Sequence, residues 1–147
     1  MRTIFSSFHT LSPVQLVDIF ELRQQVFIIE QNCIYPDIDG WDEKAEHILF
    51  YDEEILCAYL RLFGPGIKYV EASLGRIIVR RPYRGSSLGK DLITTGIQRV
   101  RLLYPEAPVK IEAQAALENY YKQFGFKSVS DIYMVDDIPH IKMVLKA

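Results

Sequence analysis

Residues 75–90 read Gly-Arg-Ile-Ile-Val-Arg-Arg-Pro-Tyr-Arg-Gly-Ser-Ser-Leu-Gly-Lys, and this stretch decides the fold. Its first part belongs to a strand from Leu74 to Arg80, because the unbroken run Ile77-Ile78-Val79 is typical of a strand covered on both faces. Its last part opens a helix from Ser87 to Tyr104. That helix carries one apolar stripe, formed by Leu88, Leu92, Ile93, Ile97, Val100 and Leu103. The sequence therefore predicts a buried strand that passes through a tight turn into a long amphipathic helix.

The turn between this strand and this helix predicts an anion-binding site. The first N–H groups of a helix have no partner inside the helix and carry a partial positive charge. Small residues in the turn let a ligand approach these amides, and basic residues on either side add charge. A pyrophosphate fits such a helix start. The candidate phosphate-binding residues are Arg84, Gly85, Ser86, Ser87, Leu88, Gly89 and Lys90.

Two other phosphate motifs do not fit these letters. A Walker A loop has four residues between its glycines and then Lys and Ser or Thr, whereas three residues separate Gly85 from Gly89, and Asp91 follows Lys90. A dinucleotide fingerprint needs Gly-x-Gly-x-x-Gly and an acidic residue on the next strand, and the turn lacks this pattern. The sequence excludes both of these nucleotide-binding classes.

The elements around this stretch predict an α+β (mixed α/β) fold. Ser12, Pro13 and Gln15 form a capping box with Pro at the first helical position, so a helix is expected to begin there. A third helix, besides this one and the helix at 87–104, is expected from Ala115 to Phe124. The expected strands cover residues 3–8, 47–51, 55–61, 74–80, 109–113, 127–133 and 138–145, the last two joined by a turn around Asp136 and Asp137. This order predicts one domain, residues 1–147, with a mixed sheet and a crossover helix between its fourth and fifth strands.

Composition narrows the possible functions. The chain has 147 residues and a net charge of −2, from 17 basic and 19 acidic residues, which argues against a nucleic-acid-binding protein. It has no apolar run long enough to cross a bilayer and no signal-peptide pattern, so a cytoplasmic location is expected. Cys33 and Cys57 fit no zinc pattern with the three histidines, and no metal or membrane partner is expected.

The central stretch resembles the signature of the GNAT N-acetyltransferases. That signature is a strand of the type Gly-Arg-hydrophobic-x-Val, then Pro-x-x-Arg-Gly-x-Gly-x-Gly, then a helix; here Ser87 stands where the family usually has its middle glycine. A serine still presents its amide to a phosphate and can add a hydroxyl donor. Further stretches resemble the ElaA branch of this superfamily, and they are residues 22–33, 35–40, 114–121 and 138–141.

The resemblance implies a fold, a cosubstrate and a set of contacts. The implied fold has a central, mostly antiparallel sheet of about seven strands flanked by about four helices. The implied cosubstrate is acetyl-CoA, with its pyrophosphate on residues 84–90 and its thioester and pantetheine along the backbone of Ile77, Ile78 and Val79. Gln114 and Asn119 add contacts to the cofactor. The partner is then a small-molecule or peptide amine, and both a monomer and a homodimer remain open.

Tyr121 is the residue that the resemblance implies as the general acid. Gly125 is expected to take a left-handed conformation after the helix, so that Phe126 packs back against Tyr121. A free phenol has a pKa near 10 and stays protonated at neutral pH, as a proton donor to a departing thiolate must. A purely packing role is the alternative, since Leu117, Tyr121 and Phe124 share one helix face.

The general base is less clearly indicated. Glu30 is the preferred candidate, and Glu71, His47 and His140 are alternatives with ordinary structural explanations. The acidic loop at residues 36–43, which includes Trp41, is expected to be solvated or to attract a cationic acceptor. As a whole the sequence predicts direct acetyl transfer from acetyl-CoA to a primary amine. A non-catalytic module that senses acyl-CoA is the alternative.

Overall fold

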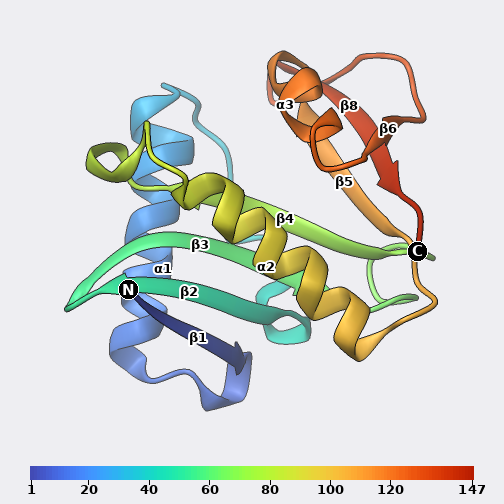
Figure 1. Cartoon of the computed structure of the whole chain (residues 1–147). Coiled ribbons are helices and arrows are strands. Elements are labelled where there is room, and N and C mark those ends of the chain that lie inside the picture. Colours follow the sequence, from blue (N-terminus) through green and yellow to red (C-terminus); the bar gives the residue numbers. More distant parts are fainter.

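A single eight-stranded sheet runs through the computed structural model, which describes all residues 1–147 (Figure 1). The strand order is β1-β2-β3-β4-β5-β8-β6, and β7 pairs with β8. All pairs are antiparallel except β4 with β5. The strands are β1 (Arg2–Ser7), β2 (Glu46–Asp52), β3 (Ile55–Phe63), β4 (Ala72–Val79), β5 (Val109–Gln114), β6 (Lys127–Ser128), β7 (Tyr133–Val135) and β8 (Ile138–Leu145). The mixed α+β fold is confirmed, with one strand more than the expected seven.

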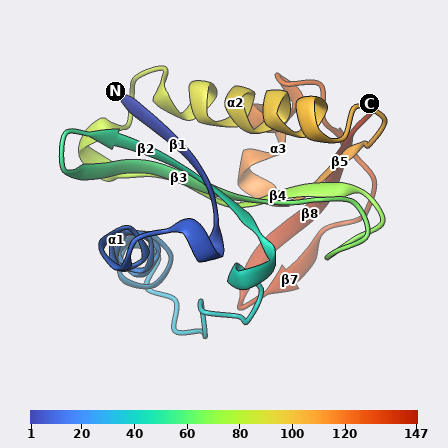
Figure 2. The same ribbon diagram turned by 90° about the horizontal axis from the view of Figure 1, so that it is seen from below.

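The three α-helices cover the two faces of the sheet unequally (Figure 2). The helix α1 (Pro13–Arg23) lies on one face, and α2 (Leu88–Leu103) and α3 (Glu118–Lys122) lie on the other. Ile78 of β4 belongs to the hydrophobic cluster under α1, whereas Ile77 and Val79 pack against the cluster under α2. The prediction that this strand is covered on both faces is therefore confirmed. None of the helices combines the length and apolarity needed to cross a lipid bilayer.

The first helix begins where the sequence predicts and continues differently. The Ser12 hydroxyl accepts from the Gln15 amide at 3.1 Å, and the Gln15 side chain accepts from the Ser12 amide at 2.8 Å, which completes the capping box. After Arg23 the chain widens into a π-helical segment, Gln24–Glu30. Such segments are rare and are frequent at functional sites. This segment brings Phe27 and Glu30 to the opening between β4 and β5.

The strand β4 carries a bulge in its middle. Its pairing with β3 shifts register between Tyr59 and Arg61, and Arg76 opposite this shift has a φ of 49°. A bulge leaves one residue unpaired in the ladder and bends the strand. A left-handed backbone at a non-glycine residue costs about 1–3 kcal/mol unless its surroundings fix it.

The strands β4 and β5 are joined only at their first residues. Their parallel pairing consists of Ala72 with Val109 and Ser73 with Lys110. Beyond these pairs the strands diverge, and Figure 1 shows them as the two arms of a V. The crossover helix α2 connects the two strands, as predicted. The divergence opens the middle of the sheet to a ligand.

Three expectations for the fold need correction. The helix expected at residues 115–124 is a 3₁₀ turn followed by the five-residue α3. The strand expected at 127–133 is divided into β6 and β7, and between them the Val129 amide still donates to the Lys142 carbonyl at 2.9 Å. Leu103, expected in the apolar stripe of α2, is 39% exposed because it lies in the last turn of the helix, beyond the sheet.

Candidate active site

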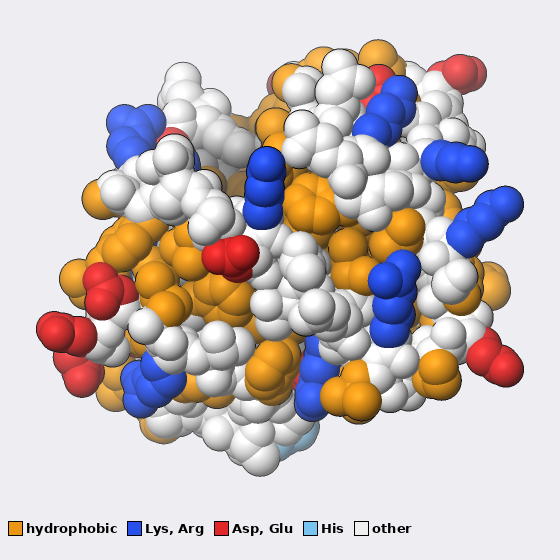
Figure 3. Space-filling view, viewed as in Figure 1, with side chains coloured by type: hydrophobic (Ala, Val, Ile, Leu, Met, Phe, Trp, Pro, Cys, Tyr) orange, Lys and Arg blue, Asp and Glu red, His pale blue; other side chains and the backbone are white.

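A cleft of about 850 Å³ lies where β4 and β5 diverge. Figure 3 shows the molecule hollowed between its two upper lobes, with hydrophobic atoms in the depth and a basic side chain at the edge. One wall is β4, where Ile77, Ile78 and Val79 all line the cleft, and the other is β5 with α3. The volume lies within the range of about 300–1,000 Å³ that is usual for small-molecule and cofactor sites.

The start of α2 presents unused backbone donors at one end of this cleft. The amides of Gly85, Ser86, Ser87, Gly89 and Lys90 donate to no protein group, whereas the Leu88 amide donates to the Ser86 hydroxyl at 3.3 Å. Gly85 has a φ of 82°, a conformation that glycine adopts without strain. This arrangement is a helix N-terminus with its positive end free, and it suits a phosphate or pyrophosphate.

The residues predicted to bind phosphate, 84–90, do not all line the same cavity. Gly89 and Arg84 line the large cleft, whereas Gly85, Ser86, Ser87 and Leu88 line a smaller pocket of about 660 Å³ beside it. Lys90 is exposed and lines neither cavity. The Ser87 hydroxyl donates to the Asp91 carboxylate at 3.3 Å, so a negative charge already stands one turn inside the helix.

Arg84 is already paired in the structure. Its Nε donates to the Val79 carbonyl at 2.7 Å, and its Nη2 donates to Glu30 at 2.8 Å. These contacts fasten the turn to the end of β4 and to the π-helical segment. The positive charge that the sequence assigns to phosphate binding is therefore balanced by a carboxylate before any ligand arrives.

Tyr121 lies on the α3 side of the cleft, 7% exposed, and Phe126 packs against its ring at 6.1 Å between centroids. Gly125 has a φ of 98°, so the left-handed end of the helix is as predicted. The Tyr121 hydroxyl forms no hydrogen bond with another protein group, and burial raises the pKa of the phenol. The side chain is thus fixed by packing, stays protonated at neutral pH, and keeps its hydroxyl free.

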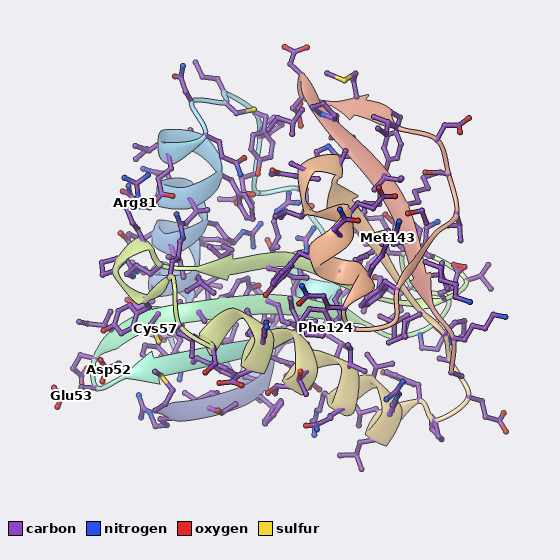
Figure 4. All side chains as sticks on the ribbon, turned by 45° about the horizontal axis from the view of Figure 1, so that its top comes forward. Asp52, Glu53, Cys57, Arg81, Phe124 and Met143 are labelled. Carbon is purple, nitrogen blue, oxygen red and sulfur yellow. The ribbon has the colours of Figure 1, made fainter.

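Tyr120, the residue before Tyr121, also lines the cleft. Its hydroxyl is close enough to the α2 start that a Cβ added at Gly89 would lie 3.1 Å from it. Its ring packs edge to face against Phe124 and against Tyr121, with both centroid distances at 5.5 Å. Figure 4 shows Phe124 at the end of α3 and Arg81 on the loop from β4 to α2. Tyr120 therefore has a packing role and faces the ligand space as well.

The four candidate bases separate clearly in space. Glu30 and His140 line the cleft, whereas Glu71 does not. His47 is fully buried, and both ring nitrogens are used inside the protein. Its Nε2–H donates to the Asp42 carbonyl at 2.9 Å, and its Nδ1 accepts from the Tyr59 hydroxyl at 2.6 Å. Burial lowers the pKa of His47 and keeps the ring neutral. The geometry removes Glu71 and His47 from the candidates for the base.

Of the two other residues predicted to contact the cofactor, one lines the cleft and one does not. Gln114, at the end of β5, lines the cleft, and Asn119 is exposed and lies outside its lining. Glu112, two residues before Gln114 on the same face of β5, also lines the cleft and was not predicted as a site residue. The hydroxyl of Tyr69 and that of Tyr133, the latter at 2.7 Å, donate to Glu112. Burial alone would raise the pKa of Glu112, but these hydrogen bonds hold it below its usual value. Strand alternation with buried Ile111 and Ala113 is the signal that could have found it.

The acidic loop at residues 36–43 is not a solvated loop. Asp37 and Asp42 are buried, and Asp39 is partly buried. These three carboxylates pair with three arginines from α1, β3 and β4, namely Arg23, Arg61 and Arg76. Trp41 has two lysines of the chain itself near its ring, Lys44 at 5.1 Å and Lys68 at 6.0 Å. The expectation of a solvated loop is wrong for its aspartates, because they pair with arginines inside the protein, whereas attraction of a cationic acceptor stays a prediction.

The two cysteines lie in different parts of the protein and form no disulfide with each other. Figure 4 shows Cys57 on β3 near the turn with Asp52 and Glu53, and burial raises the pKa of its thiol. Cys33 lines the cleft, and its thiol donates to the Asp136 carbonyl at 3.4 Å. No group of three or more His, Cys, Asp or Glu side chains is arranged to hold a metal ion.

Comparison with known proteins identifies the family to which this fold belongs. The profile of the family described as "Acetyltransferase (GNAT) domain" matches residues 11–147. The chain belongs to the GNAT acetyltransferase family. Within this family it is similar to protein ElaA of Escherichia coli, with 39% identity over 135 residues that cover 90% of this chain and 88% of the relative. A UPF0039 protein of Synechocystis is 36% identical over 140 residues, covering 95% of this chain and 91% of that protein.

Solved structures of GNAT proteins share the whole fold. An acyl-CoA N-acyltransferase from Pseudomonas aeruginosa superimposes with a TM-score of 0.94 at 34% identity, covering 98% of both chains. The crystal structure of Escherichia coli ElaA superimposes with a TM-score of 0.92 at 37% identity, covering 99% of this chain and 100% of the other. The GNAT fold expected from residues 75–90, and the resemblance to ElaA, are confirmed.

Proposed function

We propose that the chain transfers an acetyl group from acetyl-CoA to a primary amine by direct attack, within residues 1–147 acting as one domain. The observation that carries the proposal is the set of five unpaired amides at the start of α2, of which Gly89 lines the cleft that also holds the free Tyr121 hydroxyl, with Gly85, Ser86 and Ser87 in the pocket beside it. A dianionic diphosphate satisfies those amides without removing any existing hydrogen bond. Membership in the GNAT family supports acyl transfer as the reaction.

The thioester arm of the cofactor would lie along β4. Ile77, Ile78 and Val79 line the cleft directly after the bulge at Arg76, where one residue is unpaired in the ladder. An N–H group there would donate to the oxyanion of the tetrahedral intermediate. Gln114 from the facing strand and Gly89 from α2 complete the contacts that we assign to the cofactor, and Asn119 would join them only at the rim.

In the reaction the amine nitrogen attacks the thioester carbonyl carbon, and the carbon–sulfur bond then breaks. The CoA thiolate takes the proton of Tyr121, whose pKa is raised by burial, and the attacking nitrogen loses one proton. Tyr121 regains its proton from solvent after CoA leaves. The transfer needs no covalent acyl-enzyme, and Cys57 lies away from the cleft lining.

Two side chains in the cleft are placed to accept the amine proton. Glu30, the residue preferred from the sequence, accepts a hydrogen bond from Arg84. His140 donates its Nδ1–H to the Ile138 carbonyl at 2.7 Å, which leaves a lone pair on Nε2. The hydrogen bonds therefore favour His140 as the acceptor, with Glu30 as the ion-pair partner of Arg84. Steady-state kinetics of His140→Gln and Glu30→Gln distinguish them, because removing the residue that accepts the amine proton would lower kcat far more than removing the other.

Free-thiol release from acetyl-CoA in the presence of a panel of primary amines tests the proposed activity. The panel covers polyamines, amino acids, aminoglycosides and lysine peptides, and the product mass must increase by one acetyl group. Calorimetric titration with CoA measures binding separately. Absence of CoA binding would refute the placement of the phosphates. Tight binding without turnover for every amine would favour a sensing module.

A further inference from the structure

Two members of the ion cluster formed by the acidic loop at residues 36–43, Asp39 and Arg76, line the active-site cleft. Arg23 and Arg61 are fully buried beneath the loop, whereas Arg76 stands at the β4 bulge and lines the cleft. Asp37 and Asp39 also touch Arg76, and Asp42 does not. The cluster therefore links the loop to the catalytic strand through Arg76 alone.

Asp37 and Asp39 both pair with Arg76, and Asp37 is the one of the two that also pairs with Arg23 at the end of α1. Its Oδ1 lies 2.8 Å from Arg76 Nε and accepts from the Tyr35 hydroxyl at 2.7 Å. Its Oδ2 accepts from Arg23 Nε at 2.8 Å. The backbone carbonyl of Asp37 accepts from Arg23 Nη2 at 2.8 Å and from Arg76 Nη2 at 3.1 Å. One residue thus joins the end of α1, the loop and the bulge.

Arg76 needs such a partner because of its backbone. It has a φ of 49°, where glycine is favoured and an arginine is strained. The side chain of Arg76 has four neighbours. It pairs with Asp37 and Asp39, and its guanidinium carbon lies 5.7 Å from the ring centroid of Phe27 and 5.9 Å from that of Tyr35. A strained residue keeps its conformation only where its surroundings determine it. The bulge is therefore supported through its side chain rather than by its own preference.

We propose that Asp37 is a positioning residue for acyl transfer, which holds the Arg76 bulge so that the backbone of Ile77–Val79 keeps the alignment that the thioester requires. The acidic loop at residues 36–43, which the sequence suggests is solvated or attracts a cationic acceptor, acts in this way as a support for β4. The phosphate-binding amides of α2 lie at the other end of the cleft and do not touch the cluster. Removing the support therefore affects the chemical step and leaves cofactor affinity nearly unchanged.

The test compares Asp37→Asn with Asp42→Asn. Both variants remove one buried carboxylate that is bound to Arg23, but only Asp37 also contacts Arg76. We expect Asp37→Asn to lower kcat at least tenfold while the Kd for CoA changes less than threefold. Asp42→Asn should keep kcat within threefold under conditions where both variants are folded. Equal kcat for both variants, or parallel losses of kcat and CoA affinity in Asp37→Asn, would overturn the proposal.

Arg76→Lys provides a second variant in case Asp37→Asn does not fold. Lysine keeps the charge, and Arg76 is partly exposed, but an ammonium lacks the planar fork that contacts Asp37 and Asp39 together. The expected result is the same loss of kcat with little change in unfolding temperature. Full activity of Arg76→Lys would contradict the inference.

The kinetic part of this test rests on the proposed acetyl transfer, so a readout independent of activity is included. Amide hydrogen exchange of Ile77–Val79 should be at least tenfold faster in Asp37→Asn than in Asp42→Asn, when both are compared with their own global stability. Unchanged exchange overturns the positioning role even if the enzyme is active. Faster exchange in a chain that turns over no amine supports the positioning role and refutes the proposed function alone.

Discussion

Substitution of Gly89 tests the phosphate site most directly. Gly89 lies in the first turn of α2, its amide is one of the unpaired donors, and it lines the cleft. A Cβ added there would be 3.1 Å from the Tyr120 hydroxyl and 3.6 Å from Val79 Cγ2, so an alanine needs only a small movement of one side-chain end. Gly89→Glu adds, beyond this Cβ, a flexible carboxylate at the mouth of the helix.

Coulomb's law sets the size of the expected effect. Two like unit charges at roughly 5 Å and an effective dielectric constant of about 20 repel by about 3 kcal/mol. Since each 1.4 kcal/mol is about a tenfold change, Gly89→Glu should raise the Kd for CoA by about two orders of magnitude at low salt. Added salt should recover part of this loss because the site is open to solvent. Gly89→Ala should change the Kd by less than about fivefold, since it adds no charge.

Calorimetry with CoA measures both variants, and S-acetylpantetheine provides the matched control. This truncated substrate carries the thioester arm without the diphosphate, so its kcat/KM should be the same in Gly89→Glu and in the unmodified chain. If Gly89→Glu and the unmodified chain had the same Kd for CoA, the phosphates would bind elsewhere. If acetylpantetheine lost activity to the same degree, the substitution would have disturbed the fold rather than a phosphate contact.

Three further predictions concern catalysis, titration and packing. Tyr121→Phe keeps the packed ring and removes the free hydroxyl, so kcat should fall by about 10²-fold while calorimetry finds the CoA Kd within threefold; an equal loss in both would assign the residue to packing. Burial lowers the pKa of His47, so the unfolded chain takes up the proton first and stability falls as pH decreases below the ordinary value of 6.5. Between this pH and the lowered pKa the slope should be about 1.4 kcal/mol per pH unit in urea unfolding, and His47→Gln should lack it. Gly96→Val should lower the free energy of unfolding by about 1–3 kcal/mol, because even its Cβ would lie 3.0 Å from Leu60 Cδ2 and 3.1 Å from Leu74 Cδ1; unchanged stability in urea would show that the two leucines move freely.

Local chemistry explains which parts of the fold the sequence predicts. The capping box at Ser12, the hairpin with its acidic turn and the left-handed Gly125 each depend on residues that are close in the chain. The helix at 87–104 carries a regular apolar stripe. The turn at residues 84–90 combines both kinds of information, and it was enough to predict a helix start with unpaired amides.

Features that depend on distant partners could not be predicted in this way. Asp37 is 14 residues from Arg23 and 39 residues from Arg76, and no pattern in the chain pairs them. The left-handed backbone at Arg76 is equally invisible, since arginine is not a residue that usually adopts it. An acidic loop next to a tryptophan therefore suggested a surface for cations, whereas its carboxylates are used inside the protein.

The narrow junction between β4 and β5 has a consequence for how long the protein persists. Two residue pairs connect the halves of the sheet, so a molecule seated in the V would bridge both arms and oppose their separation. At a cosubstrate concentration one hundred times its Kd, this linkage would add about 2.7 kcal/mol against unfolding. Protease resistance of the chain would then increase with the concentration of acyl-CoA. At low acyl-CoA the chain would be degraded faster than at high acyl-CoA.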